Sequence, residues 1–160
     1  MENRLSRWGV GPRIVSLTLP YGIMAGIATR IWPNVCRLRI IPGVVLVKPA
    51  AVFLAAGLTM LLIAVISMNR AYNSDRLVSS GIFAVVRHPI YSAWIVLIQP
   101  GLALLGRCWP LLLMPVVAYI TFKLTIHQED EYLQQRFGQA YLDYRSGVNE
   151  LFPFPRFSPR

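Results

Sequence analysis

The chain has 160 residues, of which 55% are apolar and only 14% are charged, and its net charge is +9. An average soluble domain has about 25% charged residues, so this composition indicates a protein surrounded by lipid. The positive charge does not indicate a nucleic-acid partner. A nucleic-acid binder gathers its Lys and Arg on one polar face, whereas here they lie in the short gaps between apolar runs. No alternation of strands and helices is visible, which excludes a soluble dinucleotide-binding enzyme.

Four apolar runs predict transmembrane helices, each close to the roughly 20 residues that a span requires. In chain order they are residues 14–32, 50–68, 89–105 and 109–126. The third is short and is interrupted by Gln99-Pro100-Gly101. Residues 40–49 are apolar but too short to cross, and they either extend the second span or form an interfacial or re-entrant segment. We therefore expect an all-α, polytopic helix bundle that forms a single integral-membrane domain over residues 1–160.

The Lys and Arg residues predict the orientation in the membrane. With four spans, the N-terminus, the second loop and the C-terminal tail share one side and hold eleven of the 16, and the other two loops hold five. The positive-inside rule therefore places both termini in the cytoplasm. Cys36 and Cys108 lie on the opposite side without the spacing of a zinc or redox motif. We expect two free thiols, with a disulfide as the alternative in an oxidising compartment.

The stretch GIFAVVRHPIY, residues 81–91, places an Arg and a His directly before an apolar span. Pro89 favours the first turn of a helix, and a helix start attracts anions through its unpaired N–H groups. Arg87 adds a fixed charge whose fork suits a carboxylate or phosphate, and the ring of Tyr91 suits a cation. The alternative is a membrane anchor, in which Arg87 contacts headgroups and His88 caps the helix.

The tail from residue 127 to residue 146 predicts an amphipathic cytoplasmic helix, followed by a tail over residues 147–160. Its apolar face is formed at helical spacing by Ile126, Leu133, Phe137, Tyr141 and Tyr144. Glu129 lies on this packing face with Asp130 at its flank, and a buried carboxylate is costly unless it is paired or liganded. Either the two acids pair with Arg87 or Arg145, or they hold a cationic or hydroxyl-bearing ligand.

Two other apparent motifs lack the context that their chemistry needs. Residues 9–11 read GVG, but the strand–turn–helix setting of a dinucleotide site is missing. His127 begins HQE without the downstream P-C-x-x-C of a zinc deaminase, and no metal site is expected.

The segments LVSSGIFAVVRHPIY (77–91) and EDEYLQQRFGQAYLDY (129–144), with a helical hairpin between them, resemble the isoprenylcysteine carboxyl methyltransferase family. This family and the related phospholipid methyltransferases are integral-membrane enzymes that use S-adenosylmethionine. The resemblance covers the C-terminal half to two-thirds of the chain, and the first fifty residues match only in being apolar. The chain departs from the family in having Glu-Asp where a Glu-Glu pair is usual, Phe83 where Tyr is common, and Ala93 in place of a Gly.

The resemblance implies a cofactor pocket formed by Gly81, Arg87, His88, Pro89, Tyr91, Glu129 and Asp130. Of these, it implies that Arg87 and Glu129 act in catalysis. The cofactor would be S-adenosylmethionine, which leaves as S-adenosylhomocysteine. In-line methyl transfer depends mainly on positioning and is favoured by a dry pocket. The acceptor is expected to be a lipophilic carboxylate, thiolate or amine, and membrane lipids are the other expected partner. The sequence does not identify the acceptor, a general base or the oligomeric state.

Two other classes of function stay open. A small four-helix transporter would place an ionisable group in mid-membrane, whereas the second and third spans have none and Lys123 lies near an end of the fourth. A non-catalytic membrane scaffold of the same shape is the other alternative.

Overall fold

The computed structural model describes residues 9–38, 41–72 and 76–154, and regular structure in these ranges is helical. Residues 1–8 and residues 155–160, the last part of the predicted tail, lie outside the described residues. Four helical segments are long and apolar enough to cross a membrane: Gly11–Ile31, Gly43–Arg70, Pro89–Gly106 and Pro110–Phe137. The prediction of an all-α bundle with about four spans is therefore confirmed.

The first half of the chain forms α1 (Gly11–Ile31), α2 (Pro33–Cys36) and α3 (Gly43–Tyr72). The third span is built from α4 (Pro89–Ser92), the π-helical segment η2 (Ala93–Ile98) and α5 (Gln99–Gly106), and it follows the short 3-10 helix η1 (Gly81–Ala84). The last part comprises the 3-10 helix η3 (Pro110–Leu113), α6 (Met114–Phe137) and α7 (Gln139–Gly147).

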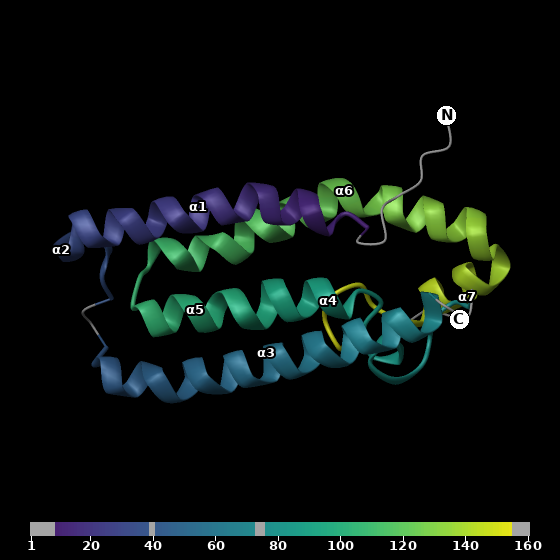
Figure 1. Ribbon diagram of the computed structural model, residues 1–160, viewed down its shortest axis with the longest axis horizontal. Coiled ribbons are helices and arrows are strands. Elements are labelled where there is room, and N and C mark those ends of the chain that lie inside the picture. Colours follow the sequence, from purple (N-terminus) through teal and green to yellow (C-terminus); the bar gives the residue numbers. More distant parts are fainter. Residues whose placement is uncertain (1–8, 39–40, 73–75, 155–160) are drawn as a thin grey trace.

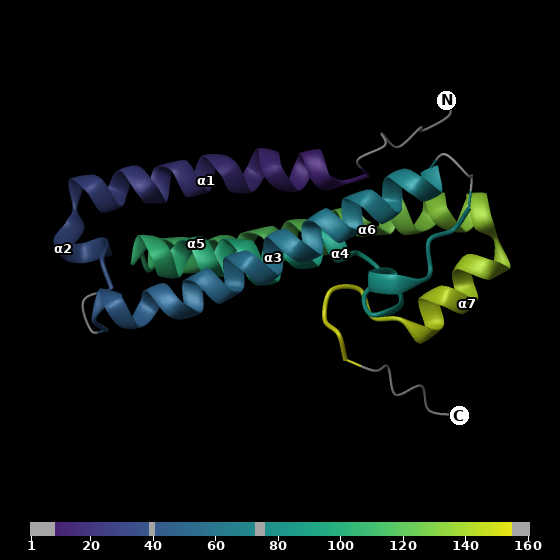
Figure 2. The same ribbon diagram turned by 60° about the horizontal axis from the view of Figure 1, so that its bottom comes forward.

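The four long segments lie roughly side by side along one axis (Figures 1 and 2). Helix α1 packs against α6, and α3 packs against α5 and η2. Many large apolar side chains on α1 and α3 point outward: Met24, Leu62 and Val44 are all exposed, the last by 76%. Such surfaces are unfavourable in water, and acyl chains of a bilayer would solvate them. The protein is an integral membrane protein.

Two glycines let α3 approach the third span closely. A Cβ atom added at Gly57 would lie 2.7 Å from Ile98 Cγ1, and one added at Gly101 would lie 2.9 Å from Leu54 Cγ. Small residues at such contacts allow close backbone packing, which supplies much of the attraction between helices in lipid. These contacts fix the third span, and with it the residues at its start.

The third span is helical throughout despite Gln99-Pro100-Gly101. Pro100 has no N–H, so it removes one α-helical hydrogen bond from the preceding turn. The π-helical segment η2 lies immediately before Pro100, where this hydrogen bond is missing. Sequence alone marks the interruption, and the structure shows that the helix widens rather than ends.

One helix boundary decides between two alternatives that the sequence left open, and another differs from the sequence prediction. Helix α3 begins at Gly43 and contains Pro49, so residues 43–49 extend the second span. Residues 127–146 do not form one separate helix, because α6 runs unbroken from the membrane span to Phe137. Gly138, with φ +56°, then turns the chain into α7.

The end of the bundle that carries α2 holds both cysteines. Arg37 and Cys108 form an isolated antiparallel bridge, and the N–H of Trp109 donates to the Cys36 carbonyl at 3.1 Å. Both cysteines are buried and free, as expected for unpaired thiols. The hydroxyl of Thr29 lies 2.7 Å from Cys108 Sγ.

Candidate functional site

The two segments that the sequence singles out meet where the starts of α1 and α4 lie beside α6, away from the end that carries α2 (Figure 1). Arg87 and His88 directly precede α4, and Glu129 and Asp130 lie on α6. Pro89 is buried and starts α4, as its place in the sequence predicts. The structure therefore brings the basic pair and the acidic pair into one cluster.

His88 lies between the two carboxylates and is only 5% exposed. Its Nδ1 is 3.5 Å from Glu129 Oε1, and its Nε2 is 3.7 Å from Asp130 Oδ1. Burial lowers the pKa of His88, but the two carboxylates raise it by more, so the net pKa is raised above the ordinary 6.5. The imidazolium is thus favoured between two anions.

Glu129 is held through its second oxygen. The Tyr91 hydroxyl donates to Oε2 at 2.9 Å, and the backbone N–H of Val10, just before α1, donates to the same oxygen at 3.2 Å. The rings of His88 and Tyr91 stack with centroids 5.7 Å apart, and Phe122 packs against both. The carboxylate is therefore held by two elements besides its own helix: the start of α4 and the turn before α1.

Asp130 is the centre of a second group of contacts. Its Oδ1 lies 3.4 Å from Arg87 Nη1 and accepts a short hydrogen bond from the Tyr141 hydroxyl. Its Oδ2 lies 3.5 Å from Arg145 Nη2 on α7. Burial, followed by the neighbouring Asp130 carboxylate, raises the pKa of Tyr141, so this hydroxyl stays protonated and donates.

The C-terminal strap, residues 148–154, closes the cluster from another side. The N–H groups of Arg87 and His88 donate to the carbonyls of Asn149 and Glu150 at 2.7 and 3.0 Å. The Glu150 carboxylate lies 3.2 Å from Arg87 Nη2. Residues just before α4 are thus attached to the C-terminal strap through both backbone and side chains.

Gly81 does not join these contacts. It is exposed with φ +62°, and a Cβ added there would meet nothing within 4 Å. The segment that it starts is attached to α7 instead, because the Tyr144 hydroxyl donates to the Phe83 carbonyl at 2.6 Å.

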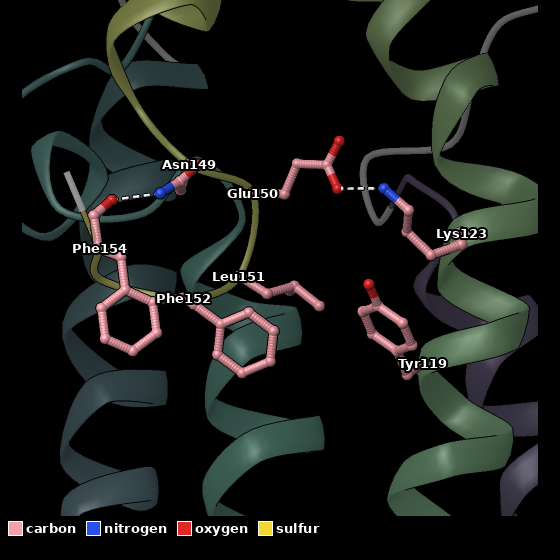
Figure 3. Close-up of a pocket in the computed structure, with 7 residues that line it drawn as sticks. All are labelled: Tyr119, Lys123, Asn149, Glu150, Leu151, Phe152 and Phe154. Carbon is pink, nitrogen blue, oxygen red and sulfur yellow. Dashed lines mark hydrogen bonds and ion pairs between the residues drawn. The ribbon is translucent and has the colours of Figure 1, made fainter. Parts of the chain in front are cut away.

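A groove lies beside the cluster, between α6 and the C-terminal strap (Figure 3). Its cavity measures about 230 Å³ and is lined by Tyr119, Lys123, Asn149, Glu150, Leu151, Phe152 and Phe154. Lys123 Nζ lies 2.7 Å from Glu150 Oε2. Because the other Glu150 oxygen faces Arg87, this side chain connects the groove to the buried cluster.

Two buried donors of the cluster have no hydrogen-bond partner among the described residues: Arg87 Nε and His88 Nε2. Buried polar groups are almost always paired, so such atoms indicate a place where a ligand or water binds. No group of three or more potential metal ligands occurs in the described part of the chain.

Sequence reasoning did not find Val10 or Glu150 as parts of the site, and it assigned Tyr141 only to an apolar face. Tyr141 is 1% exposed and lies one element beyond the acidic pair. No local pattern marks Val10, because its contact uses a backbone N–H.

The fold and the site define a class: a polytopic helical membrane protein with a buried site of mixed charge at one end of the bundle. A family model described as the isoprenylcysteine carboxyl methyltransferase (ICMT) family matches residues 51–135, more than half of the chain. The chain belongs to this family. The matched region contains the basic pair before α4 and the acidic pair on α6.

Three curated relatives carry closely similar names. Protein-S-isoprenylcysteine O-methyltransferase B of Arabidopsis thaliana is 29% identical over 61% of this chain and 58% of its own length. The Protein-S-isoprenylcysteine O-methyltransferases of Schizosaccharomyces pombe and Dictyostelium discoideum are 37% and 31% identical over 51% and 45% of this chain. The chain spans 35% and 30% of those two relatives. No solved structure shows significant similarity to the chain.

Proposed function

We propose that this protein is a membrane-embedded methyltransferase that transfers a methyl group from S-adenosylmethionine to a lipophilic acceptor. The observation that carries this proposal is the buried cluster in which Arg87 and His88 meet Glu129 and Asp130. All four residues lie inside the family-matched region. Their charges suit a cofactor that bears both an anionic and a cationic group.

The residues present fit such a cofactor. Arg87 Nε, which has no hydrogen-bond partner among the described residues, can donate to a carboxylate. Glu129 and Asp130 can accept from an ammonium group or from ribose hydroxyls. The Tyr91 ring, stacked beside His88, can face a sulfonium. When bound, S-adenosylmethionine would supply an electrophilic methyl group.

The chain's own contribution is to hold charges in place and to exclude water. Arg87 and Glu129, the proposed catalytic residues, would contact the cofactor from opposite sides of the cluster. The two carboxylates raise the pKa of His88 and so favour its protonated form, which lets the cluster present cations and anions at fixed positions. Methyl transfer by in-line displacement gains most from such positioning, and a dry site favours the loss of charge as a sulfonium reacts with an anion.

We propose that the acceptor approaches through the groove between α6 and the C-terminal strap. Leu151, Phe152 and Phe154 give the groove an apolar side, and Lys123 gives it a cation. A lipophilic carboxylate matches both features. The names of the relatives make a prenylated cysteine with a free carboxylate the first acceptor to test.

The test is S-adenosylmethionine binding by calorimetry in detergent. We expect Glu129→Ala and His88→Ala each to lose at least about tenfold in affinity, as for removal of a charge-assisted contact. Glu131→Ala removes a neighbouring but exposed carboxylate, and we expect it to bind as the native protein does. Transfer of labelled methyl to S-farnesylcysteine, with its methyl ester as the blocked control, tests the acceptor in the same preparation.

Two outcomes of the binding experiment would contradict the proposal. Native-like affinity in both variants would remove the proposed site. A native protein that binds no S-adenosylmethionine would instead favour a scaffold or a transporter.

A further inference from the structure

The turn before α1 touches the proposed cofactor site, although it lies outside the family-matched residues 51–135. In the sequence, Gly9–Gly11 is a GVG that fails as a dinucleotide motif. In the structure, its middle residue donates its backbone N–H to Glu129 Oε2 at 3.2 Å. This contact joins residues 119 positions apart in the chain.

The turn is firmly attached to the bundle. Val10 is 1% exposed and belongs to the apolar core together with Ile14, Phe122 and Ile126. Arg13 donates to the side-chain oxygen of Gln128, the residue just before Glu129. Helix α1 therefore begins at a defined position on α6, and its partial positive charge faces the Glu129 carboxylate.

Gly9 has no space for a side chain. A Cβ added at this position would lie 2.2 Å from Glu129 Oε2 and 2.9 Å from the Tyr91 hydroxyl oxygen. The φ of Gly9 is +54°, which also favours glycine. The nearest atom belongs to the end of a side chain, so an added methyl group would displace the Glu129 carboxylate.

We infer that Gly9 and Val10 are positioning residues of the cofactor site, which act by holding Glu129 Oε2 so that Oε1 faces His88. This inference rests on the proposed function, since Glu129 matters for binding only if the cofactor occupies the cluster. It assigns to the N-terminal part of the chain a role that the family-matched region does not cover.

The experiment compares Gly9→Ala with two matched glycine variants. A Cβ at Gly11 would meet only an ordinary contact, 3.6 Å from a Tyr91 ring atom, so Gly11→Ala is the control for the same turn. Gly138 has φ +56° but nothing within 4 Å, so Gly138→Ala reports the effect of backbone strain alone on the melting temperature. We expect Gly9→Ala to raise the Kd for S-adenosylmethionine roughly tenfold and Gly11→Ala to change it less than about twofold.

A double-mutant cycle separates positioning from general damage. In a Glu129→Asp background the shorter carboxylate withdraws from position 9, so we expect Gly9→Ala to cost less than about threefold there. An equal loss in both backgrounds, or native affinity in Gly9→Ala, would overturn the inference. If Gly9→Ala does not fold, Val10→Pro removes the donated N–H without adding atoms at position 9, and the same loss of affinity is expected.

A readout that needs no cofactor distinguishes this inference from the proposed function. Glu129 and Asp130 are the carboxylates that face His88, so moving Glu129 should lower the pKa of His88. Histidine-selective NMR measures this pKa, with His127→Gln to assign the only other histidine. A shift in Gly9→Ala with no cofactor binding by the native protein would refute the proposed function and retain the positioning role. An unchanged His88 pKa would refute the positioning role itself.

Discussion

At the scale of single residues, the site is a chain of alternating charges. Glu129, His88 and Asp130 follow one another within ion-pair distance, and Arg87 connects Asp130 to Glu150. Burying one such charge is costly, and the cost is offset only where each charge has partners. Removing one charged side chain is therefore expected to cost more free energy than the contact itself, because its partners stay buried without a counter-charge.

His88 gives this network a defined dependence on pH. Burial lowers its pKa and the two carboxylates raise it by more, so the folded pKa lies above the ordinary 6.5. A raised pKa contributes stability that is fully present below the unfolded value and is lost as the pH rises through the folded value. We expect the melting temperature of the native protein, relative to His88→Gln, to fall as the pH increases above the ordinary pKa of 6.5.

The measurement is a thermal melt in detergent at each pH. His127→Gln, at an exposed position on α6, is the matched control and should follow the native protein throughout. A difference between native and His88→Gln that stays constant, or grows with pH, would contradict the assigned charge state.

The candidate site was partly predictable from the sequence. A carboxylate on a packing face must find a partner, and this rule indicated Glu129 and Asp130. An Arg-His-Pro before an apolar run indicated the start of the third span. Glu150 and Val10 were not predictable, because their contacts depend on how the strap and the start of α1 are placed by distant packing.

At the scale of elements, the third span holds the site because α3 packs closely against it. Gly57 and Gly101 permit this packing, but they lie on different helices and therefore form no recognisable motif in the sequence. The apolar runs predicted the spans because their length and composition reflect the bilayer directly. Helix ends were harder to predict: nothing local stops α6 at the membrane surface, and only Gly138 ends it.

Gly57 provides a test of this packing. We expect Gly57→Ala to lower the melting temperature, because its Cβ would lie 2.7 Å from Ile98 and overpacking typically costs about 1–3 kcal/mol. Gly26→Ala is the control: a Cβ there meets nothing within 4 Å, and Ala is a better helix former than Gly by about 1 kcal/mol. A Gly57→Ala protein as stable as Gly26→Ala would show that α3 does not rest closely on the third span.

At the scale of the whole molecule, the bundle has two unlike ends. One end carries α7 and the strap, and the other carries α2 (Figure 2). The charged cluster lies toward the first end, and the two buried cysteines lie at the second. By sequence, eleven of the 16 Lys and Arg belong to the segments on the side of the cluster and five to the other side. We propose that the cluster faces the cytoplasm, which follows from the positive-inside rule and from the need of the site for a cytoplasmic cofactor.

Single introduced cysteines test this orientation in a background in which Cys36 and Cys108 are replaced by Ala. Ser79→Cys places a thiol at an exposed position on the cluster side, and Pro42→Cys places one at an exposed position on the other side. In intact cells, a membrane-impermeant maleimide should label Pro42→Cys and should reach Ser79→Cys only after the membrane is opened. The reverse pattern would put the cluster on the outer face, where a cytoplasmic cofactor does not reach it, so the proposed methyl transfer would then lose its donor.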